Sequence, residues 1–185
     1  MLNNEAEAML AEKYRLQGVT RSGWDGIEVD VLGGKFNMTD IAAAIGLGQF
    51  AQLNSITARR AELARHYFSA LGQDFEKQTG AQLPPQDYTN TNWHLFQVVL
   101  PDRITRADFM ARMKEHNIGI GYHYAPIHLF KLYRALGFKE GMFPVAERVG
   151  RQIVSLPMFY AMNEANVERT CAAMVEVLAH SPNSR

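Results

Sequence analysis

Apolar side chains recur at helical spacing through a long stretch that begins after Thr39 and Asp40. Residues three or four apart share one face of a helix, so the pattern predicts a helix of about 30 residues, roughly 45 Å long. Thr39 can cap its first turn, and Asp40 suits the positive end of the helix dipole. A helix this long exceeds the width of a small domain, so we expect it to bridge two domains or to run along a partner. The apolar positions are Ile41, Ile45, Leu53, Ile56, Leu63, Tyr67 and Leu71.

The stretch before this helix predicts a short helix and a loop. Residues 5–17 are rich in Ala, Glu, Leu and Met, and Gly18 follows them where a helix would end in a left-handed cap. Residues 19–32 mix polar side chains with Gly23 and Gly26. We expect them to form an extended loop that depends on support from another part of the protein.

After a Pro-containing loop over residues 80–92, the predicted elements alternate between strands and helices. The expected strands cover 93–100, 118–124 and 155–158, and the expected helices cover 105–117, a stretch that begins at Pro144, and 163–178. We therefore predict an α/β fold, α+β-like, in which the long helix is followed by a small sheet covered by helices. The expected parts are an arm and loop over 1–38, a bridging helix over 39–72 and a small domain over 73–185.

Composition and charge exclude several functions. The chain of 185 residues carries 19 basic and 19 acidic residues, so its net charge of zero gives nucleic acid no electrostatic attraction. Cys171 is the single cysteine and falls on an apolar helix face, so we expect inert packing, no internal disulfide and a reducing cytoplasm. The sequence has no apolar run long enough to cross a membrane and no signal-peptide pattern at its start. These features predict a soluble cytoplasmic protein.

Three motifs occur in a fixed order along the chain. Residues 33–40 read Gly-Gly-Lys-Phe-Asn-Met-Thr-Asp, residues 93–96 read Trp-His-Leu-Phe, and residues 117–124 read Asn-Ile-Gly-Ile-Gly-Tyr-His-Tyr, followed by Pro126, His128 and Leu129. Together they resemble the signature segments of the pyridoxal-phosphate (PLP)-dependent nucleotide-sugar aminotransferases, the family named after DegT, DnrJ and StrS. The resemblance covers nearly the whole chain. It implies the C-terminal part of a fold type I aminotransferase.

The resemblance implies that the loop before the long helix reaches the cofactor phosphate bound by a partner subunit. Lys35 and Asn37 are the candidate cofactor-binding residues. An ammonium and an amide beside a helix N-terminus supply charge, donors and a favourable dipole for a phosphate. Many family members have asparagine at position 35 and arginine at position 37, with tyrosine at position 34, so the residue that makes the contact stays open.

The start of the long helix is rich in small residues, which let another backbone approach closely. Tight packing within one subunit explains such residues equally well, but the preceding loop motif favours a subunit interface and hence a homodimer. The small residues are Ala42, Ala43, Ala44, Gly46 and Gly48.

His123, Tyr124 and His128 are the candidate substrate-binding residues. Pro126 restricts the backbone between them, and the resemblance implies that the His-Tyr pair faces the sugar nucleotide. A metal site is the competing interpretation, but two histidines five residues apart, without a nearby metal-binding motif, argue against it. Two surface histidines are the remaining alternative. We assign Trp93 to packing, because an aromatic residue that opens a buried strand usually belongs to the core.

By resemblance, a lysine holds PLP as a Schiff base, glutamate donates the amino group and a keto sugar on a nucleotide accepts it. That lysine lies upstream of the first motif in the family, and no lysine of this chain has its glycine-rich context. We therefore expect no catalytic residue here and no transamination by the chain alone. The alternative is a non-enzymatic remnant that dimerises or binds a partner. The lysines are Lys13, Lys35, Lys77, Lys114, Lys131 and Lys139.

Overall fold

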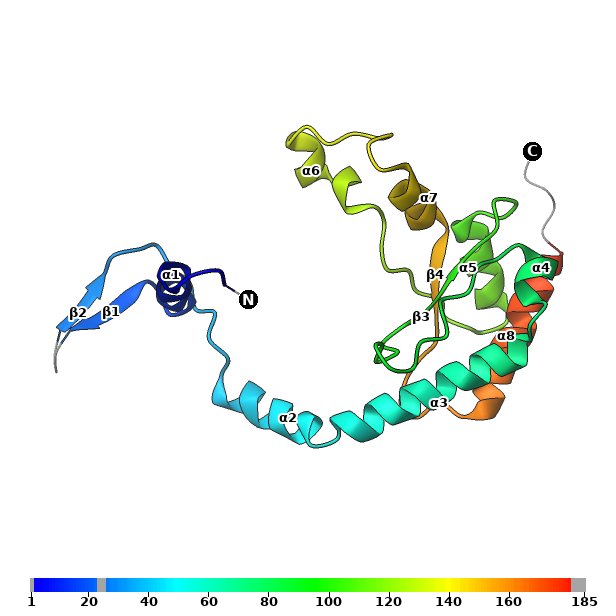
Figure 1. Cartoon of the computed structure of the whole chain (residues 1–185), viewed down its shortest axis with the longest axis horizontal. Coiled ribbons are helices and arrows are strands. Elements are labelled where there is room, and N and C mark those ends of the chain that lie inside the picture. Colours follow the sequence, from blue (N-terminus) through cyan, green and yellow to red (C-terminus); the bar gives the residue numbers. More distant parts are fainter. Residues whose placement is uncertain (1, 23–25, 181–185) are drawn as a thin grey trace. The chain divides into compact units, whose positions relative to one another are not determined.

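The computed structural model describes residues 2–22 and 26–180, and the chain forms two compact units, Met1–Leu53 and Asn54–Arg185 (Figure 1). Mixed helices and small sheets confirm the predicted fold class. Unit 1 contains α1 (Glu5–Arg15), β1 (Val19–Ser22), β2 (Gly26–Val29) and α2 (Asp40–Phe50). Unit 2 contains nearly all of α3 (Leu53–Leu71), then α4 (Phe75–Thr79), β3 (Phe96–Val99), α5 (Arg106–Glu115), the 3-10 helix η1 (Ile127–Leu129), α6 (Lys131–Ala135), α7 (Pro144–Gln152), β4 (Ile153–Leu156) and α8 (Glu164–Ala179).

Unit 1 differs from the predicted loop over 19–32, because β1 and β2 pair as an antiparallel hairpin with Val19 opposite Val29. The part of that prediction at residues 23–25 lies outside the described residues. Before the hairpin, the predicted helix is confirmed as α1, and Gly18 adopts the expected left-handed conformation with φ 75°. Pairing of two short strands depends on contacts across the hairpin, which the residue pattern along one strand does not reveal.

The single helix predicted over 39–72 is wrong in its continuity. The structure has two helices, α2 and α3, with a turn at Ala51 and Gln52 between them. The Gln52 amide bonds to the Gln49 carbonyl at 3.0 Å, a tightened turn, and the Gln52 side chain donates to the Gly48 carbonyl at 3.3 Å. Glycine weakens a helix by about 1 kcal/mol relative to alanine, so the glycines of α2 favour an end here. The Thr39 cap is confirmed, since its side chain accepts from the Ala42 amide at 3.2 Å.

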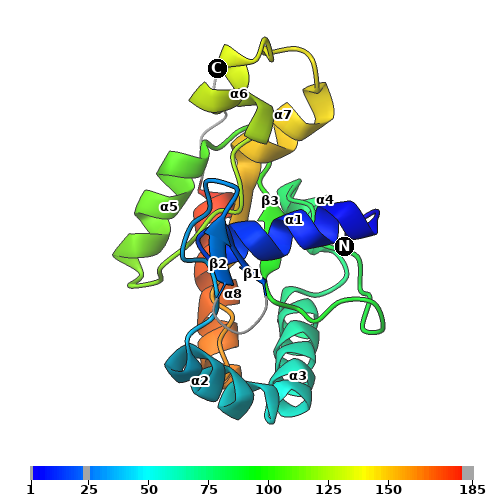
Figure 2. The ribbon, with the colours of Figure 1, turned by 90° about the vertical axis from the view of Figure 1, so that its left-hand side faces the viewer.

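The core of unit 2 lies between α3, the β3–β4 pair and α8. Tyr67 on α3 is fully buried and stacks on Phe96 of β3, with ring centroids 4.6 Å apart. Helices α5 and α8 pack together, as the green and orange-red ribbons show in Figure 2. Cys171 of α8 is buried here, which confirms its packing role, and burial raises the pKa of its thiol to about 12.

The sheet of unit 2 is smaller than predicted. Strands β3 and β4 form an antiparallel pair with Phe96 opposite Leu156. The strand expected over 118–124 is absent, because the backbone of this segment pairs with β4 only at Gly121, which exchanges two backbone hydrogen bonds with Ser155 at 3.1 and 2.8 Å. The Ile118 amide closes the end of α5 instead, by donating to the Met113 carbonyl at 3.0 Å.

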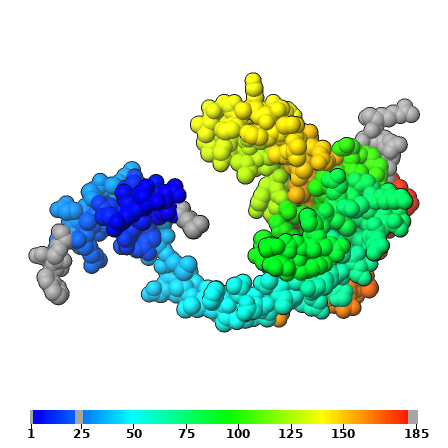
Figure 3. Space-filling view, in the orientation of Figure 1, coloured from blue at the N-terminus to red at the C-terminus, as the bar shows by residue number. Residues whose placement is uncertain are grey.

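The segment from η1 to α7 carries most of the residues that line the candidate substrate cleft, and it forms the yellow surface of unit 2 in Figure 3. Pro144 occupies the first turn of α7, and Asn163 and Thr105 cap α8 and α5 at the starts of the helices predicted over 163–178 and 105–117. Among the described residues, no helix is long and apolar enough to cross a bilayer.

Candidate active-site elements

The loop over residues 33–40 is bonded to the end of α1. The Gly34 amide donates to the Tyr14 carbonyl at 3.0 Å. Gly33 lies against the turn at Gly18, where a Cβ on Gly33 would come within 2.2 Å of the Gly18 nitrogen. A side chain does not fit at that distance, so the close approach explains the glycine at position 33.

Lys35 and Asn37 follow these glycines with unused hydrogen-bonding capacity. Lys35 is exposed, and its ammonium has no partner in the part of the chain that the structure describes. Asn37 is half-buried; its Nδ2 donates weakly to the Met38 carbonyl at 3.4 Å, while its Oδ1 is buried without a partner among the described residues. Oδ1 can only accept a hydrogen bond, so a phosphate would be bound by the second N–H of Asn37 Nδ2, which the Met38 carbonyl leaves available.

The start of α2 adds further donors beside this loop. Thr39 caps the helix through the Ala42 amide, and the amides of Asp40 and Ile41 belong to the first turn, where a helix offers no internal acceptor. A free ammonium, an amide and the positive end of a helix dipole match the chemistry of a dianionic phosphate. The residues present therefore fit the phosphate of PLP.

His123 is held by polar groups of both strands of unit 2. Its Nδ1 forms a hydrogen bond with the Ser155 hydroxyl at 2.9 Å, and its carbonyl accepts from the Gln97 side chain at 2.7 Å. The Tyr124 ring stands edge-on to the imidazole, with centroids 4.8 Å apart, and is 68% exposed. Because Nδ1 is engaged, the Nε2 atom of His123 is the nitrogen that remains for a ligand.

These two side chains line a cleft of about 530 Å³ whose remaining wall is mostly apolar and aromatic. An apolar cleft with a few oriented polar groups is the usual form of a small-molecule site. Its aromatic residues are Tyr124, Tyr133, Phe138 and Phe143.

His128 lies in the same wall but is only 8% exposed, and its Nε2 bonds to the Glu147 carboxylate at 3.0 Å. Glu147 is also buried and accepts from the amides of Gly141, at 2.9 and 3.1 Å, and Phe143, at 3.2 Å. The Gly141 amide, and then the His128 side chain, hold the pKa of Glu147 below its usual range. His128 therefore joins η1 to α7 through a charged acceptor, and Glu147 fixes the loop between α6 and α7.

Sequence reasoning missed Ser155, Gln97 and Glu147, which orient the predicted site residues. Glu147 is 19 residues from its partner His128, and Ser155 is 32 residues from His123, so spacing along the chain does not reveal either pair. One signal was present for Glu147. It lies at the start of the helix that begins at Pro144, where acidic side chains bond free amides.

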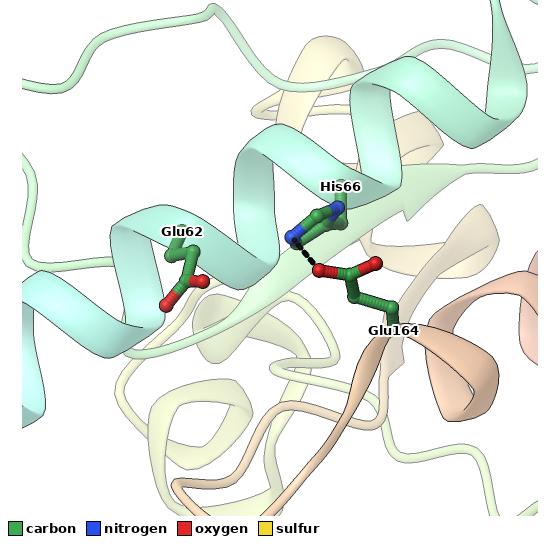
Figure 4. A group of neighbouring side chains, drawn as sticks. All are labelled: Glu62, His66 and Glu164. Atoms are coloured by element: carbon green, nitrogen blue, oxygen red, sulfur yellow. Dashed lines mark ion pairs between the residues drawn. The ribbon is translucent and has the colours of Figure 1, made fainter.

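The histidines of the site do not share a ligand set, since His123 bonds to Ser155 and His128 bonds to Glu147. The structure places a different group, Glu62, His66 and Glu164, with ligand atoms within 4.8 Å of one another (Figure 4). The His66 Nε2 lies 3.2 Å from Glu164, but Glu62 is paired with Arg59 at 2.6 Å. The guanidinium competes with a cation for Glu62, so this group is best described as a surface ion-pair network.

Trp93 is confirmed as a core residue. It is 3% exposed and stacks on Phe96, with ring centroids 5.9 Å apart. His94, the other member of that motif, lies beside Arg60, with 3.2 Å between His94 Nδ1 and Arg60 Nη1. The second motif therefore contributes mainly to packing of β3 against α3.

The fold and these motifs define a class of protein, and comparison with known sequences agrees. Residues 1–175 match the model of the DegT/DnrJ/EryC1/StrS aminotransferase family. The chain belongs to this family of PLP-dependent sugar aminotransferases.

Two curated relatives illustrate the family. The spore coat polysaccharide biosynthesis protein SpsC of Bacillus subtilis is 30% identical over 96% of this chain and 49% of its own length. The UDP-4-amino-4-deoxy-L-arabinose–oxoglutarate aminotransferase of Shewanella sediminis is 35% identical over 83% of this chain and 41% of its own length. The chain thus spans about half the length of the curated relatives that it matches.

Solved structures show the same fold. PseC of Helicobacter pylori, an aminotransferase involved in the biosynthesis of pseudoaminic acid, superposes with a TM-score of 0.80 at 19% identity, over 96% of this chain and 47% of its own. The putative sugar aminotransferase Spr1654 of Streptococcus pneumoniae in its PLP form gives a TM-score of 0.78 at 22% identity, over 95% and 45%. These matches place the described elements within the fold type I aminotransferases.

Proposed function

We propose that this chain is the C-terminal portion of an aminotransferase that moves the amino group of glutamate to a keto sugar carried on a nucleotide, in polysaccharide or lipopolysaccharide biosynthesis in the cytoplasm. The family match over residues 1–175 carries the proposal. The Shewanella relative is named for a UDP-sugar and for oxoglutarate, which is the keto acid that glutamate becomes when it gives up its amino group. That name supports both the donor and the class of acceptor.

Lys35 and Asn37 are the proposed phosphate-binding residues. The free Lys35 ammonium supplies charge, the N–H of Asn37 Nδ2 that is not directed at Met38 supplies a hydrogen bond, and the first turn of α2 adds backbone donors. When bound, PLP supplies the electron sink for amino-group transfer. This chain's residues hold the phosphate and so keep the cofactor in place.

His123 and Tyr124 are the proposed contacts to the sugar nucleotide. Ser155 fixes the imidazole and Gln97 fixes the His123 carbonyl, so the free Nε2 can bond to a sugar or phosphate oxygen, while the exposed Tyr124 ring lines the cleft. His128 is assigned to the same wall, where its bond to Glu147 makes it a residue that sets the shape of the cleft.

A homodimer is part of the proposal, with the loop over 33–40 serving the partner's cofactor. The apolar side chains of α2 support it, because Ile41 is 77% exposed, Ile45 66% and Phe50 72%. Ile45 is four residues after Ile41 and Phe50 nine, so apolar side chains lie on opposite sides of α2, and a helix that is apolar all round is normally buried against other protein.

We propose that the chain alone does not catalyse the reaction, because it lacks a lysine placed to attach PLP covalently. Lys13 forms an ion pair with Asp30, and Lys35 is assigned to the phosphate. Adding PLP, reducing with borohydride and mapping the adduct tests this point. We expect scattered, substoichiometric labelling of surface lysines, whereas a stoichiometric adduct on one lysine would contradict the proposal.

The activity itself is tested in the complete enzyme that contains this chain, with glutamate and a UDP-linked keto sugar. We expect oxoglutarate to accumulate beyond one equivalent per site only when both substrates are present, and His123→Ala to raise KM for the sugar more than for glutamate. A protein that produces no oxoglutarate with any keto sugar nucleotide would support the alternative of a non-enzymatic remnant.

A further inference from the structure

A second cleft lies on the opposite face of α7 from the His123 cleft, with a volume of about 630 Å³. Successive residues of a helix are rotated by about 100°, so Arg148 and Arg151 point away from the face of Val149 and Gly150 that lines the first cleft. The second cleft is bounded on its other side by the start of α5. It shares no lining residue with the proposed sugar site.

Three arginines line this second cleft, namely Arg106, Arg148 and Arg151, against one carboxylate, Asp102. Asp102 accepts a hydrogen bond from the Gln152 side chain. The cleft is therefore strongly cationic in a chain with a net charge of zero. Such a concentration of one sign of charge focuses the field on an anionic ligand.

Two of these guanidinium groups are not committed to strong internal pairs. Arg148 is exposed and has no hydrogen-bond or ion-pair partner among the described residues. Arg151 lies 3.6 Å from Glu140, but both side chains are more than half exposed, at 60% and 72%. An exposed pair of that length contributes little stability, so a ligand with higher charge density can replace Glu140.

Arg106 is held in place from two sides. Its Nη1 donates to the Gly150 carbonyl at 2.6 Å, and its guanidinium carbon lies 4.1 Å from the centre of the Tyr122 ring. A guanidinium has five N–H donors in a rigid fork, so the bond to Gly150 leaves others available. Because the group is already oriented, binding a ligand costs it little side-chain entropy.

Backbone donors border the same cleft. Arg106 and Ala107 are the first residues of α5, a helix of 10 residues that Thr105 caps through the Asp108 amide. The amides of Arg106 and Ala107 have no acceptor inside the helix. The arginine fork and these amides thus lie on one side of the cleft, and the two arginines of α7 lie on the other.

We propose that this cleft binds a diphosphate group, either free or carried by a nucleotide. Side chains three residues apart on a helix have Cβ atoms about 5–6 Å apart, so Arg148 and Arg151 can each contact one of two adjacent phosphoryl groups. Arg106 and the α5 amides bind the oxygens that face away from α7. The site is independent of the proposed sugar cleft. Diphosphate binding gives a role to charged residues that the proposed aminotransferase reaction does not use.

The test is a titration of the full chain with inorganic diphosphate, followed by calorimetry and by backbone amide NMR. We expect shifts at the amides of Arg106 and Ala107, and the double substitution Arg148→Gln, Arg151→Gln should weaken diphosphate binding at least about tenfold. Arg148→Lys with Arg151→Lys should recover only part of the affinity, because lysine keeps the charge but not the bidentate geometry. Lys114→Gln, which removes one exposed charge from α5, is the matched control and should bind as the wild type does.

Further probes identify the source of the diphosphate group. Tighter binding of uridine diphosphate than of inorganic diphosphate at these same amides supports a nucleotide ligand, and equal binding supports the free anion. The proposal is overturned if the double glutamine variant binds diphosphate like the wild type, or if Lys114→Gln weakens it equally. It is also overturned if shifts occur only around His123. Shifts confined to the surroundings of His123 would still support the proposed sugar site, so the experiment can contradict the diphosphate proposal without contradicting the proposed function.

Discussion

Replacing Gly150 by alanine tests whether packing of α7 sets the wall of the sugar cleft. A Cβ at position 150 would lie 2.6 Å from Pro126 Cδ and 3.0 Å from Pro126 N. Ordinary carbon contacts are about 3.5–4.0 Å, so one of the two backbones has to move by about 1 Å. Pro126 follows His123 and Tyr124 by three and two residues, and the shift falls on the segment that carries them.

Two opposing effects determine the change in the free energy of unfolding. Alanine in a helix interior is about 1 kcal/mol more favourable than glycine, whereas overpacking costs about 1–3 kcal/mol. We expect a net destabilisation of about 0–2 kcal/mol. The effect on function should be larger, because a displacement of about 1 Å in a group that positions substrate can reduce the rate about a hundredfold.

The assay combines thermal unfolding, NMR of the His123 imidazole and binding of a nucleotide sugar. Gly48→Ala is the matched control, since a Cβ on this other helical glycine meets nothing within 4 Å and should make α2 more stable. Gly150→Ala should shift the His123 ring signals and weaken binding. If Gly150→Ala stabilises the protein as much as Gly48→Ala does, and leaves the His123 ring signals and nucleotide-sugar binding unchanged, the packing argument is wrong.

Three further predictions concern the charged and small residues. Hydrogen bonds from the Gly141 amide and His128 lower the pKa of Glu147 in the folded protein. Its contribution to the free energy of unfolding is therefore complete above the pKa of Glu147 in the unfolded chain and is lost as pH falls through the lower folded pKa. Glu147→Gln should reduce this loss of stability at acid pH, measured by unfolding curves at several pH values. Lys35→Ala and Asn37→Ala should each weaken PLP retention in the complete enzyme about ten- to hundredfold, measured by cofactor release. Bulky substitutions at Ala43 or Gly46 should weaken self-association in sedimentation without unfolding unit 2.

The sequence predicts best those features that depend on neighbouring residues. Thr39, Thr105 and Asn163 cap helices where expected, because a cap is a bond between residues two or three apart. Helix α7 likewise begins at Pro144, whose fixed φ suits a first helical position.

Features that depend on distant partners could not be predicted in this way. The β1–β2 hairpin arises from pairing between two strands, and the segment expected as a strand over 118–124 pairs its backbone with β4 only through Gly121 and Ser155. The partners that orient the site, Ser155 and Glu147, come from a strand and a helix far along the sequence from the histidines that they hold. The family motifs indicate which residues face a ligand, while the structure shows what fixes them.

The central claim is that this chain completes the cofactor site of a neighbouring subunit. Mixing two impaired forms of the complete enzyme tests it most directly, one form with Lys35→Ala and the other without the lysine that attaches PLP. We expect the mixed dimer to regain amino transfer from glutamate to the keto sugar nucleotide, because both lesions then fall in one shared site and leave the other intact. If heterodimers form, as mass-tagged subunits would show, and activity still does not return, the loop around Lys35 does not serve the partner's cofactor.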